Sequence, residues 1–423
     1  MTRSALIHRD FRIYVIGNFF ALNGLWIQRI TISWLGWSLT GSASFVGILA
    51  FLMMLPTLIF GPLLGVLADR TNVRIAAMGT QTALFAVTLA LTITYFSGLL
   101  SSTVLAMSAI SNGLVTALHH PIRMAMAPRL VPIEAIGAAV PIISINFNLS
   151  RFLGPFIAGT LIATLGVGSA LVVNAAAFLP LIFALSFIHP RPKSGPPKDR
   201  IGFLESFRDG LTHTRRDPLI LTGILVTAIT SLSARGVQEI LPVIADGVFQ
   251  QGASGLGQLT AAAGLGALAS SIMLARHPIA AEDGLPRASL IGACVSLSLV
   301  VALAFAPYWW LALLCVAGLG ASGTQVGVGI QSAIQIRLDD DMRGRVMSLW
   351  TTTAIGATAL GALALGAGAD VVGLHAALAI SATISATALT VTFLRYRTAL
   401  RANPSSLSKN RERSDLENGL PPP

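Results

Sequence analysis

The amino-acid sequence predicts an all-α membrane protein with twelve transmembrane helices in two pseudo-symmetric six-helix bundles. Hydrophobic residues make up 54% of the 423-residue chain and charged residues only 11%, whereas a soluble domain carries roughly a quarter charged residues. Twelve stretches are long enough to cross a bilayer core of ~30 Å, which takes about 20 apolar residues in a helix. These observations indicate a chain that folds within a lipid bilayer.

The twelve predicted spans follow one another with mostly short connections. They are 13–37, 44–66, 75–97, 102–120, 138–163, 168–188, 218–244, 255–275, 288–306, 308–333, 346–368 and 374–394. The first stretch is longer than the apolar region of a signal peptide, so we expect it to be retained as a span. An even number of spans places both termini on one side of the membrane.

The loops on the two sides of the predicted bundle differ in charge. Six short loops contain no lysine or arginine: 38–44, 98–102, 164–168, 245–252, 306–308 and 370–375. Of the 28 basic residues, three fall inside predicted spans, and the termini and the other loops hold the remaining 25. Basic residues gather in cytoplasmic loops, so we expect both termini in the cytoplasm. The same rule explains the net charge of +10 without a nucleic-acid partner, and we expect none.

The longest internal hydrophilic segment, 189–217, divides the chain into two halves. It begins with several prolines, which cannot continue a helix, and Phe203, Phe207 and Leu211 then recur near helical spacing among charges. We expect an amphipathic helix along the cytoplasmic surface. The predicted units are an N-terminal six-helix bundle over 1–188, the linker over 189–217, a C-terminal six-helix bundle over 218–396 and a disordered tail over 397–423.

A motif stands at the cytoplasmic end of the second predicted span. It reads Gly65-Val66-Leu67-Ala68-Asp69-Arg70-Thr71-Asn72-Val73-Arg74. It resembles the loop 2–3 signature of the major facilitator superfamily, in which an acid follows a glycine by four residues and basic residues come next. The sequence departs from that signature at Asn72, usually glycine, and at Val73, often basic. Asparagine tolerates the left-handed backbone nearly as glycine does, so the turn can survive.

Other segments resemble one branch of this superfamily, which includes bacterial enterobactin-type exporters. They are Trp26-Ile27-Gln28-Arg29, Pro121-Ile122-Arg123, Asn148-Leu149-Ser150-Arg151 and Arg343-Gly344-Arg345. The resemblance implies alternating access between two six-helix halves in a bacterial plasma (inner) membrane. It also implies a conformational latch at the cytoplasmic side, formed by Gly65, Asp69, Arg70, Arg74, Arg343 and Arg345. The alternative for Asp69 is a solvated turn charge.

The fifth predicted span resembles the glycine ladder that exporters of this superfamily carry around a Gly-Pro pair. Gly154, Pro155 and Gly159 form the ladder here, and Ser150 and Ala158 stand in place of two glycines. We therefore expect Gly154, Pro155 and Gly159 to form a helix-packing motif. The fourth predicted span, 102–120, lacks the arginine of many proton-coupled drug exporters. Coupling to protons is accordingly left open.

Ionisable side chains inside the predicted spans are the leading site candidates. Each costs at least about 2.5–3.5 kcal/mol at the centre of a membrane helix, so it normally faces a cavity or a partner. Arg29 shares a helical face with Asn23 and Trp26, and Arg151 shares one with Asn148. We expect these residues to bind substrate. The alternatives are that Arg29 snorkels to the outer interface and that Arg151 bonds carbonyls freed near Pro155.

Two further candidates, Arg235 and Glu239, stand four residues apart in the seventh predicted span. That is the spacing of a helical ion pair. The pair is expected either to neutralise itself near the outer interface or to form a gate or coupling site. Glu239 is the only acid placed well inside a span, which makes it the leading candidate for a proton carrier.

The sequence favours a secondary transporter that exports a small molecule, such as a siderophore, drug or metabolite. Three arginines in a cavity favour an anionic one. The alternatives are an importer or a lipid flippase of the same fold and, from another class, an intramembrane enzyme or a receptor. We expect no enzymatic activity, since catalytic motifs are not apparent, and no metal or cofactor, since Cys294 and Cys315 have no ligand neighbours at suitable spacing. We also expect a monomer.

Overall fold

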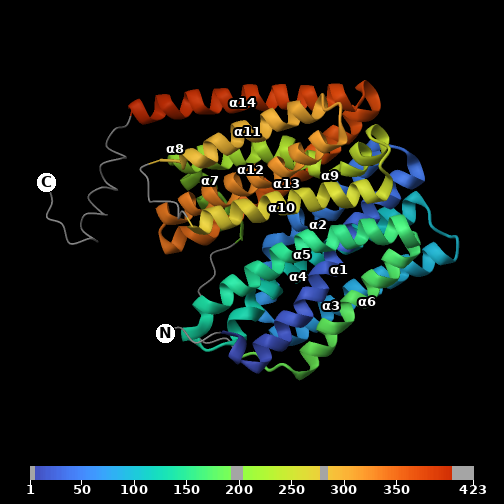
Figure 1. Ribbon diagram of the computed structural model, residues 1–423. Coiled ribbons are helices and arrows are strands. Elements are labelled where there is room, and N and C mark those ends of the chain that lie inside the picture. Colours follow the sequence, from blue (N-terminus) through green and yellow to red (C-terminus); the bar gives the residue numbers. More distant parts are fainter. Residues whose placement is uncertain (1–4, 192–202, 277–283, 403–423) are drawn as a thin grey trace.

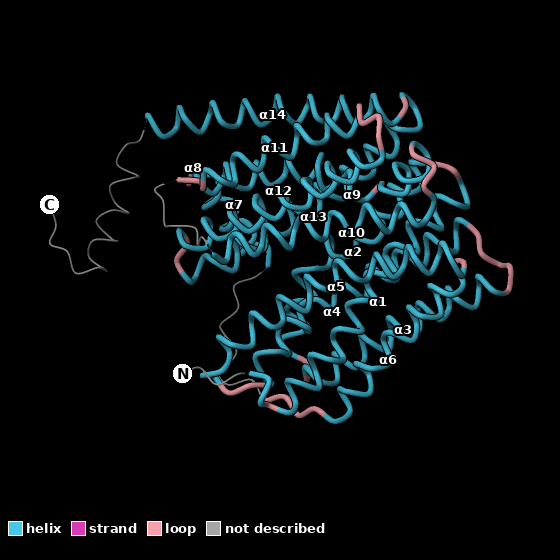
Figure 2. The backbone as a smooth tube through the Cα atoms, in the orientation of Figure 1, coloured by secondary structure: helices cyan, strands magenta, loops and turns pink. Residues whose placement is uncertain are grey.

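The computed structural model describes residues 5–191, 203–276 and 284–402. The side chains at 62–63, 65–70, 203–207, 340–341 and 399–402 lie outside this description. Over the described ranges the regular elements are helices without any strand (Figure 2). The helices form two bundles that lie one above the other in Figure 1. The predicted all-α membrane fold is confirmed.

The N-terminal bundle contains the first six long helices. They are α1 (Arg9–Thr40), α2 (Ala43–Arg70), α3 (Val73–Phe96), α4 (Ser102–Met126), α5 (Ile136–Leu165) and α6 (Val167–Phe187). Polar caps set several of the helix starts: Ser42, Asn72 and Ser101 each accept a bond from a backbone N–H in the first turn that follows. The helices therefore begin where short polar residues interrupt the apolar sequence.

The C-terminal bundle begins after the linker helix α7 (Phe203–Arg216). It consists of α8 (Pro218–Thr230), π-helix η4 (Ser231–Arg235), α9 (Gly236–Glu239), π-helix η5 (Val243–Val248), α10 (Gly252–Arg276), α11 (Arg287–Ala304), α12 (Trp309–Arg337), α13 (Asp340–Val372) and α14 (Leu374–Ala402). The seventh predicted span is thus a series of α- and π-helical segments. Local π-helical turns are rare and often occur at functional sites.

Ten helices in the described ranges are long and apolar enough to cross a membrane. The long helices α1 and α4 fall short of that test because they carry more polar residues. Asn18, Asn23 and Gln28 of α1 and Asn112 and His119 of α4 are nevertheless buried inside the bundle. Asn23 bonds Ser150 of α5, and Gln28 and His119 bond side chains of α3. These three polar side chains therefore face other helices rather than lipid, as is usual in membrane proteins.

The two halves touch along α2 with α13 and along α5 with α10. Small residues allow the approach. A Cβ atom on Gly366 would lie 2.4 Å from the Ala43 carbonyl oxygen, and one on Gly159 would lie 2.6 Å from the Gly257 Cα. These backbones are closer than any side chain permits, which is the packing mode expected between membrane helices.

Two predicted boundaries are corrected. Helix α4 continues through Pro121 to Met126 and so contains Arg123, which had been placed after the span. A proline is tolerated inside a membrane helix because neighbouring groups satisfy the freed backbone. Helix α14 continues to Ala402 instead of giving way to a tail at 397, and residues 403–423 lie outside the described ranges.

The linker helix α7 lies at the end of the molecule where α1 begins and α14 ends (Figure 1). We call this the linker end, and the opposite one the far end. Asp209 of α7 accepts a bond from Arg345 at 2.8 Å. Asp217 caps the first turn of α8 and also pairs with Arg337. The linker helix is therefore tied to the C-terminal bundle.

Candidate functional site

A cavity of about 490 Å³ lies between the two halves. Its polar and aromatic lining includes Trp26, Arg29 and Ser33 of α1, Asn112 and Thr116 of α4, Phe147 and Arg151 of α5, Arg235, Gln238 and Glu239 of the broken seventh span, Thr260 of α10 and Thr324 of α12. Helix α2 adds Met53 and Met54, and α13 adds Thr358. Each half thus contributes four helical segments to the wall of one central cavity.

Two arginines of the N-terminal half flank a single indole ring. The Arg29 Cζ lies 5.7 Å from the Trp26 ring centroid and the Arg151 Cζ lies 6.0 Å from it. Guanidinium groups are attracted to the face of an aromatic ring within about 6 Å. Trp26 therefore holds both guanidinium groups against the same wall of the cavity.

The acid of the cavity bridges the two halves. Glu239 of α9 accepts a hydrogen bond from Arg29 of α1 within an ion pair. The predicted pair between Arg235 and Glu239 is therefore corrected: the partner of Glu239 comes from the other bundle. Arg235 is the last residue of the π-helix η4, and its guanidinium donates to the Gly323 carbonyl of α12 at 3.4 Å.

The cavity carries a positive charge. Its lining contains three arginines and one glutamate, and the other lining residues are uncharged. Only one arginine is neutralised by the glutamate, which leaves a formal excess of two positive charges. Charges interact more strongly in a confined, water-poor space than in bulk water. The lining is therefore suited to hold an anion.

Two candidate residues from the sequence lie outside the cavity lining. Asn23 is buried and donates to the Phe19 carbonyl at 2.8 Å and to Ser150 Oγ at 3.1 Å. Asn148 donates to the Ser144 carbonyl within its own helix at 2.9 Å. The structure places Asn23 at the contact between α1 and α5, whereas Trp26, Arg29, Arg151, Arg235 and Glu239 all line the cavity.

Several lining residues were not singled out from the sequence. Phe147, Asn112, Gln238, Thr260 and Thr324 are uncharged, so no cost of burying a charge marks them as unusual in a span. A signal did exist for Gln238, which precedes Glu239, and for Phe147, which stands one turn before Arg151. Position relative to a charged neighbour is the clue that finds such residues.

At the far end, acids from the C-terminal half hold helix ends of the N-terminal half. Asp370 of α13 accepts bonds from the hydroxyl of Ser42 at 2.7 Å and from the backbone N–H groups of Ala43 and Ser44 at 2.9 Å each. These groups open α2, where a negative charge is favoured by the helix dipole. Asp246 accepts a bond from Trp37 Nε1 at 2.8 Å. We call Asp370 and Asp246 the far-end clasps.

The predicted latch at the linker end is described only in part. The side chains of Gly65, Asp69 and Arg70 lie outside the description. Arg74 donates to the carbonyls of Leu185 and Ser186 at the end of α6. Arg343 donates to the Leu338 carbonyl at 3.3 Å, and Arg345 bonds Asp209 of the linker helix.

The glycine ladder of α5 contacts two different neighbours. A Cβ on Gly154 would lie 2.5 Å from the Trp26 Cβ of α1, and one on Gly159 would meet α10 of the other half. Pro155 is buried between them, and its carbonyl faces Gly257. Gly154 thus sets how far Trp26 stands from α5, and with it the wall of the cavity.

Two six-helix halves around a shared, charged central cavity define a transporter of the major facilitator superfamily. Within that class the chain belongs to the transmembrane secretion effector family, whose profile matches residues 2–418.

Curated relatives agree with this assignment. The chain is 30% identical over 190 residues to an uncharacterised MFS-type transporter, YfiS, of Bacillus subtilis (strain 168). The matched segment covers 43% of this chain and 44% of that protein. It is 30% identical over 241 residues to the enterobactin exporter EntS of Escherichia coli O1:K1 / APEC, and this match covers 55% of this chain and 56% of that protein. The matches span about half the length of these relatives.

Solved structures share the fold. The nucleoside transporter NupG superposes with a TM-score of 0.69 at 14% identity over 91% of this chain and 98% of that one. A bacterial homologue of the iron transporter ferroportin superposes with a TM-score of 0.68 at 18% identity over 92% and 98%. At these identities the likeness concerns the fold.

Proposed function

We propose that the protein is a secondary exporter of a small anionic molecule and works by alternating access between its two halves. The observation that carries the proposal is the central cavity, in which three arginines from both halves meet a single glutamate. A site that opens alternately to either side must be touched by both halves, and transporters of this architecture place it at their interface.

Electrostatics supports an anionic substrate. Arg151 and Arg235 have no carboxylate among their hydrogen-bond partners in the described residues, so a substrate anion would meet unsatisfied cationic donors. Bidentate bonds between arginine and a carboxylate or phosphate are among the strongest polar contacts in proteins. The indole of Trp26 and the ring of Phe147 add flat apolar surface beside these donors. An aromatic acid fits this combination.

Export is the proposed direction because the relatives include an exporter of enterobactin. Glu239 is the proposed site of coupling. A substrate anion that binds Arg29 would displace the Glu239 carboxylate from its ion pair. After the substrate leaves on the outer side, Glu239 would take up a proton there and release it on the cytoplasmic side before the next substrate binds, so that protons move inward as the substrate moves outward without any ATP site.

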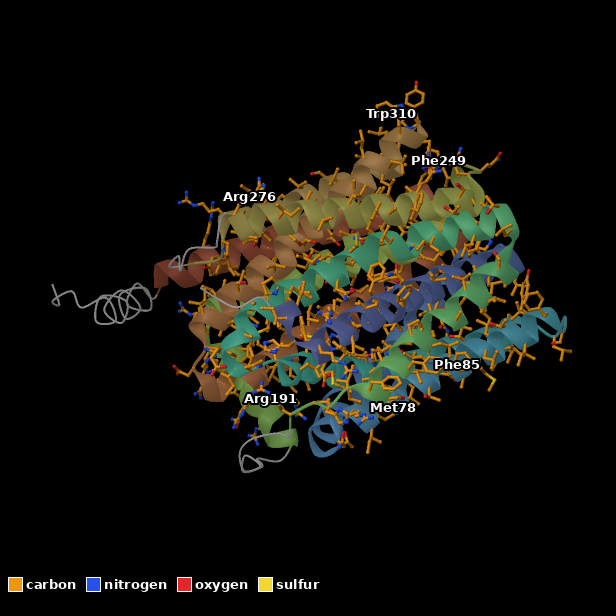
Figure 3. The ribbon with its side chains drawn as sticks, turned by 60° about the horizontal axis from the view of Figure 1, so that its bottom comes forward. Met78, Phe85, Arg191, Phe249, Arg276 and Trp310 are labelled. Carbon is orange, nitrogen blue, oxygen red and sulfur yellow. The ribbon has the colours of Figure 1, made fainter. Side chains whose placement is uncertain are left out.

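The proposed location is a bacterial inner membrane with both termini and the linker end in the cytoplasm, and the protein is proposed to act as a monomer. Figure 3 shows Arg191 and Arg276 toward the linker end and Phe249 and Trp310 toward the far end. Basic residues on one side and interfacial aromatics on the other follow the usual membrane pattern. Impermeant thiol reagents added outside cells should label cysteines placed in 38–44 or 245–252 and spare those in 189–217. The opposite pattern would reverse the orientation.

Transport into membrane vesicles tests the function. A panel of labelled aromatic carboxylates, each with its uncharged amide, would be presented to inverted and to right-side-out vesicles. We expect uptake of at least one carboxylate into inverted vesicles, no uptake of its amide, and loss of uptake in Arg151→Ala. Uptake confined to right-side-out vesicles would indicate an importer, and movement of fluorescent phospholipids between leaflets would indicate a flippase. Either result would overturn the export proposal.

A further inference from the structure

A fourth arginine lies inside the N-terminal half, away from the cavity lining. Arg123 stands in the last turn of α4, near the linker end, and is only 8% exposed. Its Cζ lies 5.4 Å from the centroid of the Phe147 ring on α5. The titratable side chains near its charge are Tyr14, His119 and His120, none of which is a carboxylate.

The hydrogen-bonding capacity of Arg123 is unused. A guanidinium carries five N–H donors, and within the described part of the chain none of those of Arg123 is in a hydrogen bond or an ion pair. A buried charge normally persists only when it is paired and hydrogen-bonded. Contact with a phenyl ring compensates a small part of that cost. The side chain is therefore short of an anionic partner.

Other arginines at the same end show what a structural role looks like. Arg74 donates to the carbonyls that end α6, and Arg191 donates to the carbonyls of Pro128 and Val131. Arg337 and Arg345 each pair with an aspartate. Each of these side chains closes a helix end or a loop. Arg123 has the burial of a structural arginine without the bonds of one.

The Phe147 ring connects Arg123 to the cavity. Phe147 lines the cavity, and its centroid lies 6.3 Å from that of Trp26. Trp26 in turn carries the guanidinium groups of Arg29 and Arg151. Two neighbouring aromatic rings therefore connect Arg123, at the linker end of α4, with Arg29 and Arg151 at the centre of the molecule, in steps of 5.4 to 6.3 Å. A planar anion can keep one ring and one guanidinium in contact while it moves between successive positions.

We propose that Arg123 and Phe147 form a second anion-binding site, occupied by aromatic carboxylates on their way between the linker end and the central cavity. The inference rests on the proposed anion transport and adds a location to it. The carboxylate would accept bonds from the free guanidinium donors of Arg123, and the ring would stack on Phe147. The same ligand would then move to Trp26, Arg29 and Arg151.

The stoichiometry of ligand binding tests the second site. The full-length protein in detergent would be titrated calorimetrically with 4-nitrobenzoate and, for comparison, with the uncharged 4-nitrobenzamide. We expect two equivalents of the carboxylate on the wild-type protein, one on Arg123→Gln and one on Arg151→Gln, with no binding of the amide. The matched control is Arg12→Gln, which removes the same charge from an exposed position at the same end, and it should retain two equivalents.

A second variant guards against loss of folding in Arg123→Gln. Arg123→Lys keeps the charge but loses the planar fork, so it should retain two equivalents with one of them about tenfold weaker. Two unchanged equivalents in Arg123→Gln would overturn the second site. So would a wild-type protein that binds one equivalent, lost in Arg151→Gln alone, although the central anion site would then stand. Equal binding of the amide, or no binding of the carboxylate, would contradict the anion proposal itself.

Discussion

At the scale of single residues, the cavity arginines differ in what neutralises them. Arg29 has a carboxylate partner in Glu239, Arg235 has a carbonyl of α12, and Arg151 has the face of Trp26. An arginine that is satisfied only by an aromatic ring retains most of its donors for a ligand. Arg151 is therefore the residue that we expect to contribute most to substrate affinity.

Replacing Arg151 should weaken binding more than folding. Hydrogen bonds to charged groups contribute about 1.5–3 kcal/mol, so Arg151→Ala should reduce the affinity for an aromatic carboxylate by roughly 10- to 100-fold. Arg151→Lys should recover only part of it because lysine lacks the planar fork. Calorimetry on both variants measures the effect. Wild-type affinity in Arg151→Ala would remove Arg151 from the site.

The ion pair between Arg29 and Glu239 predicts a specific rescue. Arg29→Ala should lower the apparent melting temperature because it leaves the Glu239 carboxylate, which is only 11% exposed, without its partner, at a cost of about 1–3 kcal/mol. The double variant Arg29→Ala/Glu239→Ala should recover most of that loss. In the comparison pair, adding Glu239→Ala to Arg235→Ala should not recover stability, since Arg235 bonds the Gly323 carbonyl and not Glu239. Rescue by the second pair and not by the first would contradict the pairing.

Sequence reasoning found the charged residues of the cavity lining and missed their partners. An ionisable residue in a span is visible because burial is costly, which marked Arg29, Arg151, Arg235 and Glu239. Helical spacing then suggested that Arg235 and Glu239 pair, because sequence spacing predicts contacts within one helix only. The partner of Glu239 depends on how the halves dock. Arg123 was missed as an internal charge because the predicted fourth span ended at residue 120, whereas α4 continues to Met126.

At the scale of helices, close packing of glycines sets the contact between halves. Gly159 of α5 lies against Gly257 of α10, and a Cβ there would meet backbone atoms that no rotamer change can move. The glycine ladder could be recognised from its spelling in the sequence. Its partner helix could not, because glycine is frequent throughout the chain and carries no directional signal.

Gly159→Ala should weaken the interface between α5 and α10. The added methyl group would stand 2.6 Å from the Gly257 Cα, so the helices must separate and lose contact along their length. We expect a lower apparent melting temperature and slower transport. Gly137→Ala is the matched control, because it is in the same helix and a Cβ there meets no atom within 4 Å. Equal effects in the two variants would refute a special role for Gly159.

The cytoplasmic latch is proposed to act at the end of α2. Asp69→Asn removes a charge and almost no volume, so the protein should still insert and fold while transport slows. The effect is read from uptake into vesicles at matched protein levels. If transport kinetics were unchanged, Asp69 would be a surface turn residue, and its motif would have no role in the transport cycle of this protein.

At the scale of the whole molecule, hydropathy and loop charge predicted the twelve-helix fold. They did not predict which residues of one half contact the other half. Asp246 and Asp370 were visible in the sequence only as the acids of otherwise uncharged loops. In the structure each holds a helix end of the opposite half. Together with the α2–α13 and α5–α10 contacts, the far-end clasps join the halves at one end of the cavity. Alternating access requires these clasps to release in each transport cycle.

A reversible crosslink across the far end tests alternating access most directly. Cysteines would replace Ser42, the N-cap of α2, and Asp370 of α13, whose side chains are hydrogen-bonded at 2.7 Å. The native Cys294 and Cys315 would be replaced by serine. Uptake of an aromatic carboxylate into inverted vesicles would be measured after oxidation and again after reduction. We expect the disulfide to abolish uptake and reduction to restore it, while carboxylate binding from the linker end persists in both states. Undiminished uptake by the fully crosslinked protein would contradict the alternating opening of the two halves.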